Sequence, residues 1–139
     1  TDAPAGIERG VKNLLPATDS FILVTTPDDV AIRDAERVLA LLDEKKKPRP
    51  MLVVNRLPEK LVLSGDCYSA QTVANTLDVP LLGYIPDDPA VVAAINRHES
   101  FMMQDCPAAQ AMDRICRRFL GEYVPLPEIV KKRKWFFKK

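Results

Sequence analysis

The run Met51-Leu52-Val53-Val54-Asn55-Arg56 decides the fold of this chain. Its four apolar residues follow one another without alternation, as expected of a strand that is buried on both faces. Two similar runs lie on either side of it in the sequence, Phe21-Ile22-Leu23-Val24 and Leu81-Leu82-Gly83-Tyr84-Ile85. Strands of this kind are typical of a parallel sheet whose faces are covered by helices.

Helical patterns separate and follow these runs. Apolar residues recur at helical spacing in four segments: 30–42, 69–77, 89–96 and 107–120. Lys45-Lys46-Lys47 before Pro48 ends the first helix, Ser69 is the expected N-cap of the second, and Gly121 ends the last. The order strand, helix, strand, helix, strand, helix, helix predicts an α/β fold, a mostly parallel sheet flanked by helices with right-handed crossovers.

The composition describes one globular domain. The chain has 139 residues, of which 47% are hydrophobic, so it can bury a real core and is not a disordered chain. Cys67, Cys106 and Cys116 are odd in number and spaced unlike a disulfide framework or a zinc site, which indicates reduced cysteines in a cytosolic protein. No apolar run approaches the roughly 20 residues that a membrane-spanning helix needs.

The end of the chain is strongly basic. The last twelve residues hold six basic groups against one glutamate, a net charge of +5, whereas the whole chain carries +1 and the rest of it therefore carries −4. This asymmetry predicts an anionic partner for the tail alone.

The tail also has an apolar face when drawn as a helix. Ile129, Val130, Phe136 and Phe137 share that face, with Trp135 at its side, while Lys131, Lys132 and Lys134 lie off it and Arg133 interrupts it. Aromatic residues beside cations predict an amphipathic helix that lies on an anionic membrane. Nucleic-acid binding and a disordered solubilising tail are the alternatives, and the Trp-Phe-Phe cluster favours the membrane.

Polar residues stand where the predicted strands end. They are Asn55-Arg56 after the second run and Pro86-Asp87-Asp88 after the third, and ligands of open parallel sheets bind at that edge. Asp2, followed by Pro4 and Gly6, is typical of a further strand exit. A carboxylate there reaches Mg²⁺ directly or through water; an Asp that caps a turn is the alternative.

Six segments in sequence order carry a family resemblance. They are Asp2-Ala3-Pro4-Ala5-Gly6-Ile7-Glu8; Thr25-Thr26-Pro27 with Ile32-Arg33-Asp34-Ala35; Val54-Asn55-Arg56; Gly65-Asp66 with Ser69; Leu82-Gly83-Tyr84-Ile85-Pro86-Asp87-Asp88; and Leu120-Gly121-Glu122 with Pro125. Together they resemble the MinD family of ATPases that position the bacterial division septum. The resemblance implies that residues 1–126 are the C-terminal part of a P-loop ATPase domain of MinD/ParA type and that residues 127–139 are a basic membrane-targeting tail.

The resemblance also implies an activity and partners. The full-length protein is expected to use ATP and Mg²⁺, to form an ATP-dependent homodimer, and to bind MinC-like and MinE-like division regulators. It is expected to be cytoplasmic and peripheral on the inner face of the cell membrane, without a nucleic-acid partner. The chain contains no Gly-Lys pair, so the phosphate-cradling loop and its lysines lie outside it, and the fragment alone is expected to be inactive.

Individual roles follow from the same resemblance. Asp2 corresponds to the Walker B carboxylate at Mg²⁺, and Gly6 lies in a switch segment near the γ-phosphate. Ala3 stands where the family usually has Ser. Asn55 corresponds to the adenine-reading amide, Arg56 flanks the base or ribose, and the segment Pro86-Asp87-Asp88 forms the far wall of the base pocket.

Three charged residues early in the first helix have two interpretations. Arg33, Asp34 and Glu36 are either an ordinary solvated helix face or a surface for the dimer or a partner. Two other functions also remain open for the whole protein: a ParA-type partitioning or flagellar-placement ATPase, and a non-enzymatic membrane-binding adaptor. The terminal Trp-Phe-Phe segment argues against a DNA-partitioning relative.

Overall fold

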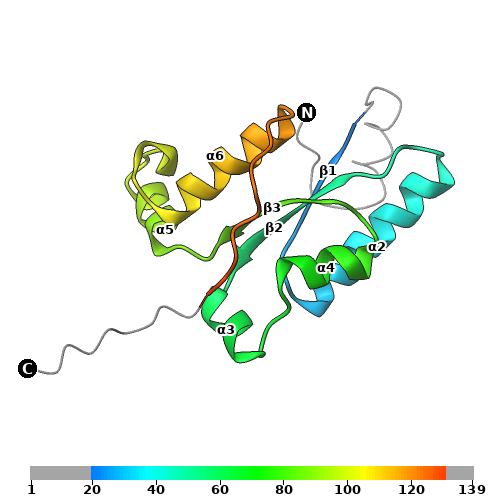
Figure 1. Ribbon diagram of the computed structural model, residues 1–139, viewed down its shortest axis with the longest axis horizontal. Helices are drawn as coiled ribbons and strands as arrows, with labels where there is room; N and C mark the ends of the chain where they lie inside the picture. Colours follow the sequence, from blue (N-terminus) through cyan, green and yellow to red (C-terminus); the bar gives the residue numbers. More distant parts are fainter. Residues whose placement is uncertain (1–19, 131–139) are drawn as a thin grey trace, which may run out of the picture.

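The computed structural model describes residues 20–130 of the chain (Figure 1). Within them, β1 (Ile22–Thr25), β2 (Met51–Leu57) and β3 (Leu81–Pro86) form one parallel sheet in the order β1-β2-β3. The three apolar runs therefore became the three strands, and the predicted α/β class is confirmed. Each strand ends one to three residues beyond its apolar run.

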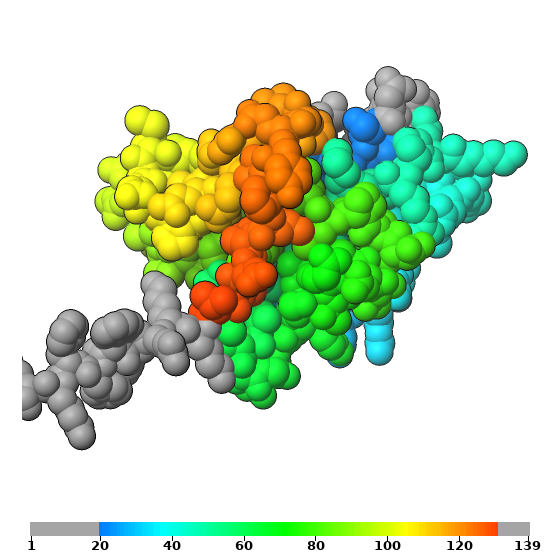
Figure 2. Space-filling model, in the orientation of Figure 1, coloured from blue at the N-terminus to red at the C-terminus, as the bar shows by residue number. Residues whose placement is uncertain are grey.

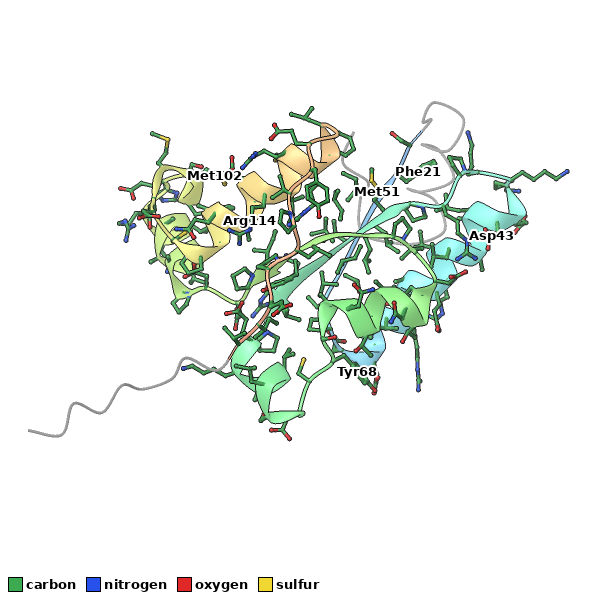
Figure 3. All side chains as sticks on the ribbon, in the orientation of Figure 1. Phe21, Asp43, Met51, Tyr68, Met102 and Arg114 are labelled. Atoms are coloured by element: carbon green, nitrogen blue, oxygen red, sulfur yellow. The ribbon has the colours of Figure 1, made fainter. Side chains whose placement is uncertain are left out.

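Helices cover both faces of the sheet (Figure 1). The helical segments are α2 (Asp29–Glu44), α3 (Glu59–Ser64), α4 (Ala70–Leu77), α5 (Pro89–Asn96), α6 (Pro107–Phe119) and a 3₁₀ turn, η2 (Phe101–Met103). The helices α2 and α4 lie on one side of the sheet, and α5 and α6 lie on the other. In Figure 3, Asp43 and Tyr68 accordingly lie across the sheet from Met102 and Arg114.

Local sequence signals set the helix ends. The Asp28 carboxylate accepts a hydrogen bond from the Ala31 N–H at 2.9 Å, and the Ser69 hydroxyl accepts one from the Thr72 N–H at 3.0 Å. Ser69 is thus the N-cap that the sequence predicted. The helix α2 ends at Glu44, immediately before the three lysines.

The main core lies between the sheet and the helices α2 and α4. Leu52, Val54 and Leu57 of β2 are fully buried there. On the other face α6 packs closely on β3, because Gly83 has no side chain: a Cβ atom at this position would lie 2.6 Å from Cγ1 of Ile115. Two faces with separate cores make β2 the buried centre of the described fold.

The residues after α6 form an extended segment, 122–130, which we term the C-terminal strap. It has no helix or strand and runs from the end of α6 across the molecule toward α3 (Figure 1). In Figure 2 its orange and red atoms lie between those of α6 and those of α3 and α4. The predicted tail helix is therefore not present over residues 127–130. Lys131, Lys132, Lys134, Trp135, Phe136 and Phe137 lie outside the described residues.

Candidate functional site

The carboxyl ends of β2 and β3 bring Asn55, Arg56 and Asp87 to one edge of the sheet. The expectation that Asn55 and Arg56 follow the second strand was wrong, because β2 continues to Leu57. The ladder between β2 and β3 is irregular between Val54 and Leu57. Asn55 and Arg56 therefore form a local irregularity within the strand, and such irregularities re-aim side chains near functional sites.

Asn55, Arg56 and Asp87 form one polar cluster. Arg56 has a φ of +53°, and its N–H donates to Oδ1 of Asn55 at 2.9 Å. Its Nε lies 3.7 Å from Oδ1 of Asp87, whose own N–H donates to the Leu57 carbonyl at 2.9 Å. The Nδ2 group of Asn55 has no partner within residues 20–130. This cluster therefore offers an amide donor at the sheet edge.

Asp88 has a different role from its neighbour Asp87. One carboxylate oxygen accepts a hydrogen bond from the Ala90 N–H at 2.9 Å, and the other accepts one from the Ala108 N–H at 3.0 Å. These two bonds lower the pKa of Asp88. Since both oxygens are engaged with helix N-termini, the geometry assigns Asp88 to positioning α5 and α6. Pro86 is buried at the end of β3 and supports the same turn.

A groove of about 330 Å³ opens beside the cluster, between β1 and α2. Its polar lining comes from Asn55, Thr25, Thr26 and Asp34. Asp34 also pairs with Arg37 at 3.0 Å, while Arg33 and Glu36 are exposed on the same helix. All three residues predicted as a dimer or partner surface are therefore exposed, and Asp34 alone of the three also lines this groove with Asn55.

Thr25 and Thr26 were not expected to share a groove with Asn55. Thr25 is the last residue of β1 and is buried, and its register partner in β2 is Val54, the residue before Asn55. The available signal was its position: a polar residue that ends a buried strand lies at the same edge as the other strand ends.

A second, apolar groove lies on the opposite face of the sheet. Its volume is about 540 Å³, and Ile22 and Val24 of β1 line it together with Met112, Ile115 and Phe119 of α6. Ile22 and Val24 are 45% and 59% exposed. In the described part of the chain β1 has a partner strand only on its β2 side, so this edge of the sheet is open.

The described residues hold neither a metal cluster nor a membrane-spanning helix. No group of three or more His, Cys, Asp or Glu side chains that could hold a metal lies within residues 20–130. None of their helices is both long enough and apolar enough to cross a bilayer. Asp2 and Gly6, the expected Mg²⁺ and γ-phosphate residues, lie outside the described residues, and their roles stay predictions.

Curated relatives match this chain along nearly its whole length. The septum site-determining protein MinD of Helicobacter pylori is 38% identical over 142 residues, which is 97% of this chain and 53% of that protein. MinD of Bacillus subtilis is 40% identical over 135 residues, covering 96% of this chain and 50% of that protein. The chain thus spans about half the length of these relatives. No family model matches it.

Solved structures give the same result for the fold. A MinD cell division protein of Aquifex aeolicus has a TM-score of 0.84 at 35% identity, covering 91% of this chain and 54% of that one. A MinC:MinD complex from the same organism gives a TM-score of 0.83 at 34% identity, covering 90% of this chain and 52% of that one. MinD of Pyrococcus horikoshii, solved with Mg-ADP, shares the fold with a TM-score of 0.68 at 21% identity, covering 85% and 48%. In sequence and in fold, over the part of those proteins that it spans, the chain belongs to the MinD family of septum site-determining proteins.

Proposed function

We propose that the protein containing this chain is an ATPase that positions the division septum. The observation that carries the proposal is the match to MinD proteins at 38% to 40% identity over nearly the whole chain. The Mg-ADP in the Pyrococcus horikoshii MinD supports ATP and Mg²⁺ as cofactors.

The sheet edge suits the base of a nucleotide. Nδ2 of Asn55, without a partner among residues 20–130, is a donor and Oδ1 is an acceptor, so the amide can pair with an adenine edge. The ion pair between Arg56 and Asp87, at 3.7 Å, links this irregular part of β2 to the residue after β3. The described residues offer no phosphate cradle. The expected Mg²⁺ carboxylate, Asp2, lies beyond them, so the described part of the chain would contribute the base pocket.

We propose further that the protein dimerises with ATP and then attaches reversibly to the inner face of the cell membrane through its basic tail. Two weak tails in one dimer bind far more tightly than one, because the second attachment is intramolecular. The Aquifex MinC:MinD complex supports a MinC-like partner. A MinE-like regulator and a cytoplasmic location complete the proposal.

The test uses the full-length protein with anionic vesicles and Mg²⁺. ATP is expected to promote dimerisation and co-sedimentation, and ADP is not. The Asn55→Ala variant is expected to lose discrimination between ATP and GTP, because an adenine-reading amide is removed. Asp34→Ala is the matched control, since it also lines the groove but offers no amide. Vesicle binding that is independent of nucleotide would contradict the proposed cycle, and unchanged discrimination would contradict the role of Asn55.

A further inference from the structure

One arginine joins the last helix, the sheet and the C-terminal strap. Arg118 lies in the last turn of α6, and its three guanidinium nitrogens each donate to a carbonyl. Nη1 donates to Leu82 of β3 at 2.9 Å, Nε to Val124 at 2.6 Å and Nη2 to Pro125 at 2.7 Å. Hydrogen bonds from a charged donor are among the strong ones, so this latch fixes the first part of the strap.

Two glycines, Gly83 and Gly121, allow these hydrogen bonds of Arg118 to form. Gly83 leaves room for the guanidinium, because a Cβ atom at that position would lie 2.9 Å from Nη1 of Arg118. Gly121 follows α6 with a φ of +89°, and the Glu122 N–H donates back to the Arg117 carbonyl at 3.0 Å. This C-terminal turn reverses the chain and directs the strap over Arg118. Arg118 has no carboxylate partner among the described residues, so its bonds serve the strap and β3.

A second anchor lies near the other end of the strap. Ile129 is half-buried and packs against the main core, as Val62 of α3 does. Val130, the next residue, is 66% exposed. Pro125 and Pro127 stiffen the segment between the two anchors. The strap is therefore held both by Arg118 and by Ile129.

We infer that the strap is part of the folded domain and that the membrane-contacting tail begins at Val130. The inference deepens the proposed membrane attachment and rests on it for the role of the tail. Ile129 then belongs to the folded domain and does not contact the membrane, although a helical drawing of the tail places it beside Phe136 and Phe137. The strap then ends beside α3 and not at the end of α6, and the bonds of Arg118 fix its first part (Figure 1).

The latch is tested without lipid, by a double-mutant cycle on the unfolding of the full-length protein in urea. Ile129→Ser and Arg118→Met are each expected to lower the unfolding midpoint. The double variant is expected to lose less free energy of unfolding than the sum of the two single losses, because either change alone releases the same strap. Arg37→Met is the control, since Arg37 pairs with Asp34 within α2 at 3.0 Å and not with the strap, and its effect should add to that of Ile129→Ser. Additive effects of Arg118→Met and Ile129→Ser would overturn the latch.

The boundary of the tail is tested with anionic vesicles. Ile129→Ser is expected to leave vesicle affinity within about twofold, whereas Phe136→Ser should lower it by about tenfold or more, because a buried aromatic side chain is lost from the lipid. Ile129→Ala is the milder variant if Ile129→Ser does not fold. An affinity loss with Ile129→Ala as large as that of Phe136→Ser would place Ile129 in the membrane and overturn the inference. If the unaltered protein does not bind vesicles, the proposed attachment fails, and the urea cycle still decides whether the strap is latched.

Discussion

The carboxylate of Asp88 accepts a hydrogen bond from the Ala108 N–H at 3.0 Å, across 20 residues of sequence. The same side chain caps α5 through Ala90. One residue at the end of the β3 turn therefore sets the start of two helices, α5 and α6. Because α6 carries Arg118, this cap also helps to place the latch on β3.

Asp88→Ala is expected to lower the free energy of unfolding of the full-length protein by about 1–3 kcal/mol, since losing one N-cap costs roughly 0.5–2 kcal/mol and here two helix starts lose theirs. The contribution also depends on pH. The pKa of Asp88 is lowered in the folded protein. Its carboxylate therefore stabilises the fold above the usual aspartate pKa of 3.8, and this stabilisation is lost as the pH falls below that value. Urea denaturation between neutral and acidic pH measures both effects.

Asp87→Ala is the control for this prediction. Asp87 is exposed, and its carboxylate makes only a long ion pair with Arg56 at 3.7 Å, so its loss should cost under about 0.5 kcal/mol. Equal costs for the two variants would contradict the capping role of Asp88.

Gly83→Ala is expected to destabilise the protein by about 1–3 kcal/mol through overpacking between β3 and α6. The added Cβ atom would meet Ile115 at 2.6 Å and Arg118 at 2.9 Å. In an Ile115→Ala background, which removes both Cγ1 and Cδ1 of that side chain, Gly83→Ala should cost less than it does alone. Urea midpoints of the single and double variants measure this, and an unchanged midpoint for Gly83→Ala would refute the close packing.

Purified alone, the 139-residue chain is expected to self-associate. Within residues 20–130 the outer edge of β1 has no partner strand, and that edge and the apolar groove beside it offer Ile22 and Val24 to a second copy. Val24→Lys places a charge on that edge and should shift the chain toward monomer in sedimentation velocity. Val92→Lys is the matched control, because Val92 is similarly exposed at 61% but lies on α5. A monomeric unaltered chain with a sharp two-state melt would contradict this prediction.

The sequence predicted those elements whose signals are local. Apolar runs located the strands, and helical spacing with Ser69 as N-cap located α4, because burial and capping depend on neighbours in sequence. The end of β2 was missed because Asn55 and Arg56 are polar residues in an irregular part of the strand. The six-residue helix α3 was missed because its apolar residues, Leu61, Val62 and Leu63, are consecutive and so show no helical spacing.

Contacts in the site and in the strap join residues that are far apart in sequence. Asn55, Arg56 and Asp87 were expected at one edge and meet there, because the carboxyl ends of parallel strands share an edge. Ile129 was assigned to a membrane face by helical spacing alone. Its packing depends on a strap that Arg118 holds to β3, and the Arg118–Leu82 bond joins residues 36 positions apart. Periodicity within the tail carries no information on such a contact.

The basic and aromatic residues of the tail are expected to contribute to membrane binding by different mechanisms. Replacing Lys131, Lys132 and Lys134 by Gln in the full-length protein should weaken binding to anionic vesicles and make the remaining binding less sensitive to salt. Each basic residue near an anionic surface is worth about 1 kcal/mol, and salt screens that attraction. Replacing Trp135, Phe136 and Phe137 by Ser should instead abolish insertion at every salt concentration, because the apolar area that enters the lipid is lost.

Trp135 is the single tryptophan of the chain, so a blue shift of its fluorescence reports insertion directly in the isolated chain. Equal affinity for neutral and anionic vesicles, or an unshifted Trp135 spectrum at saturating lipid, would exclude an interfacial tail, and tight binding to DNA in the same assay would favour a nucleic-acid partner instead.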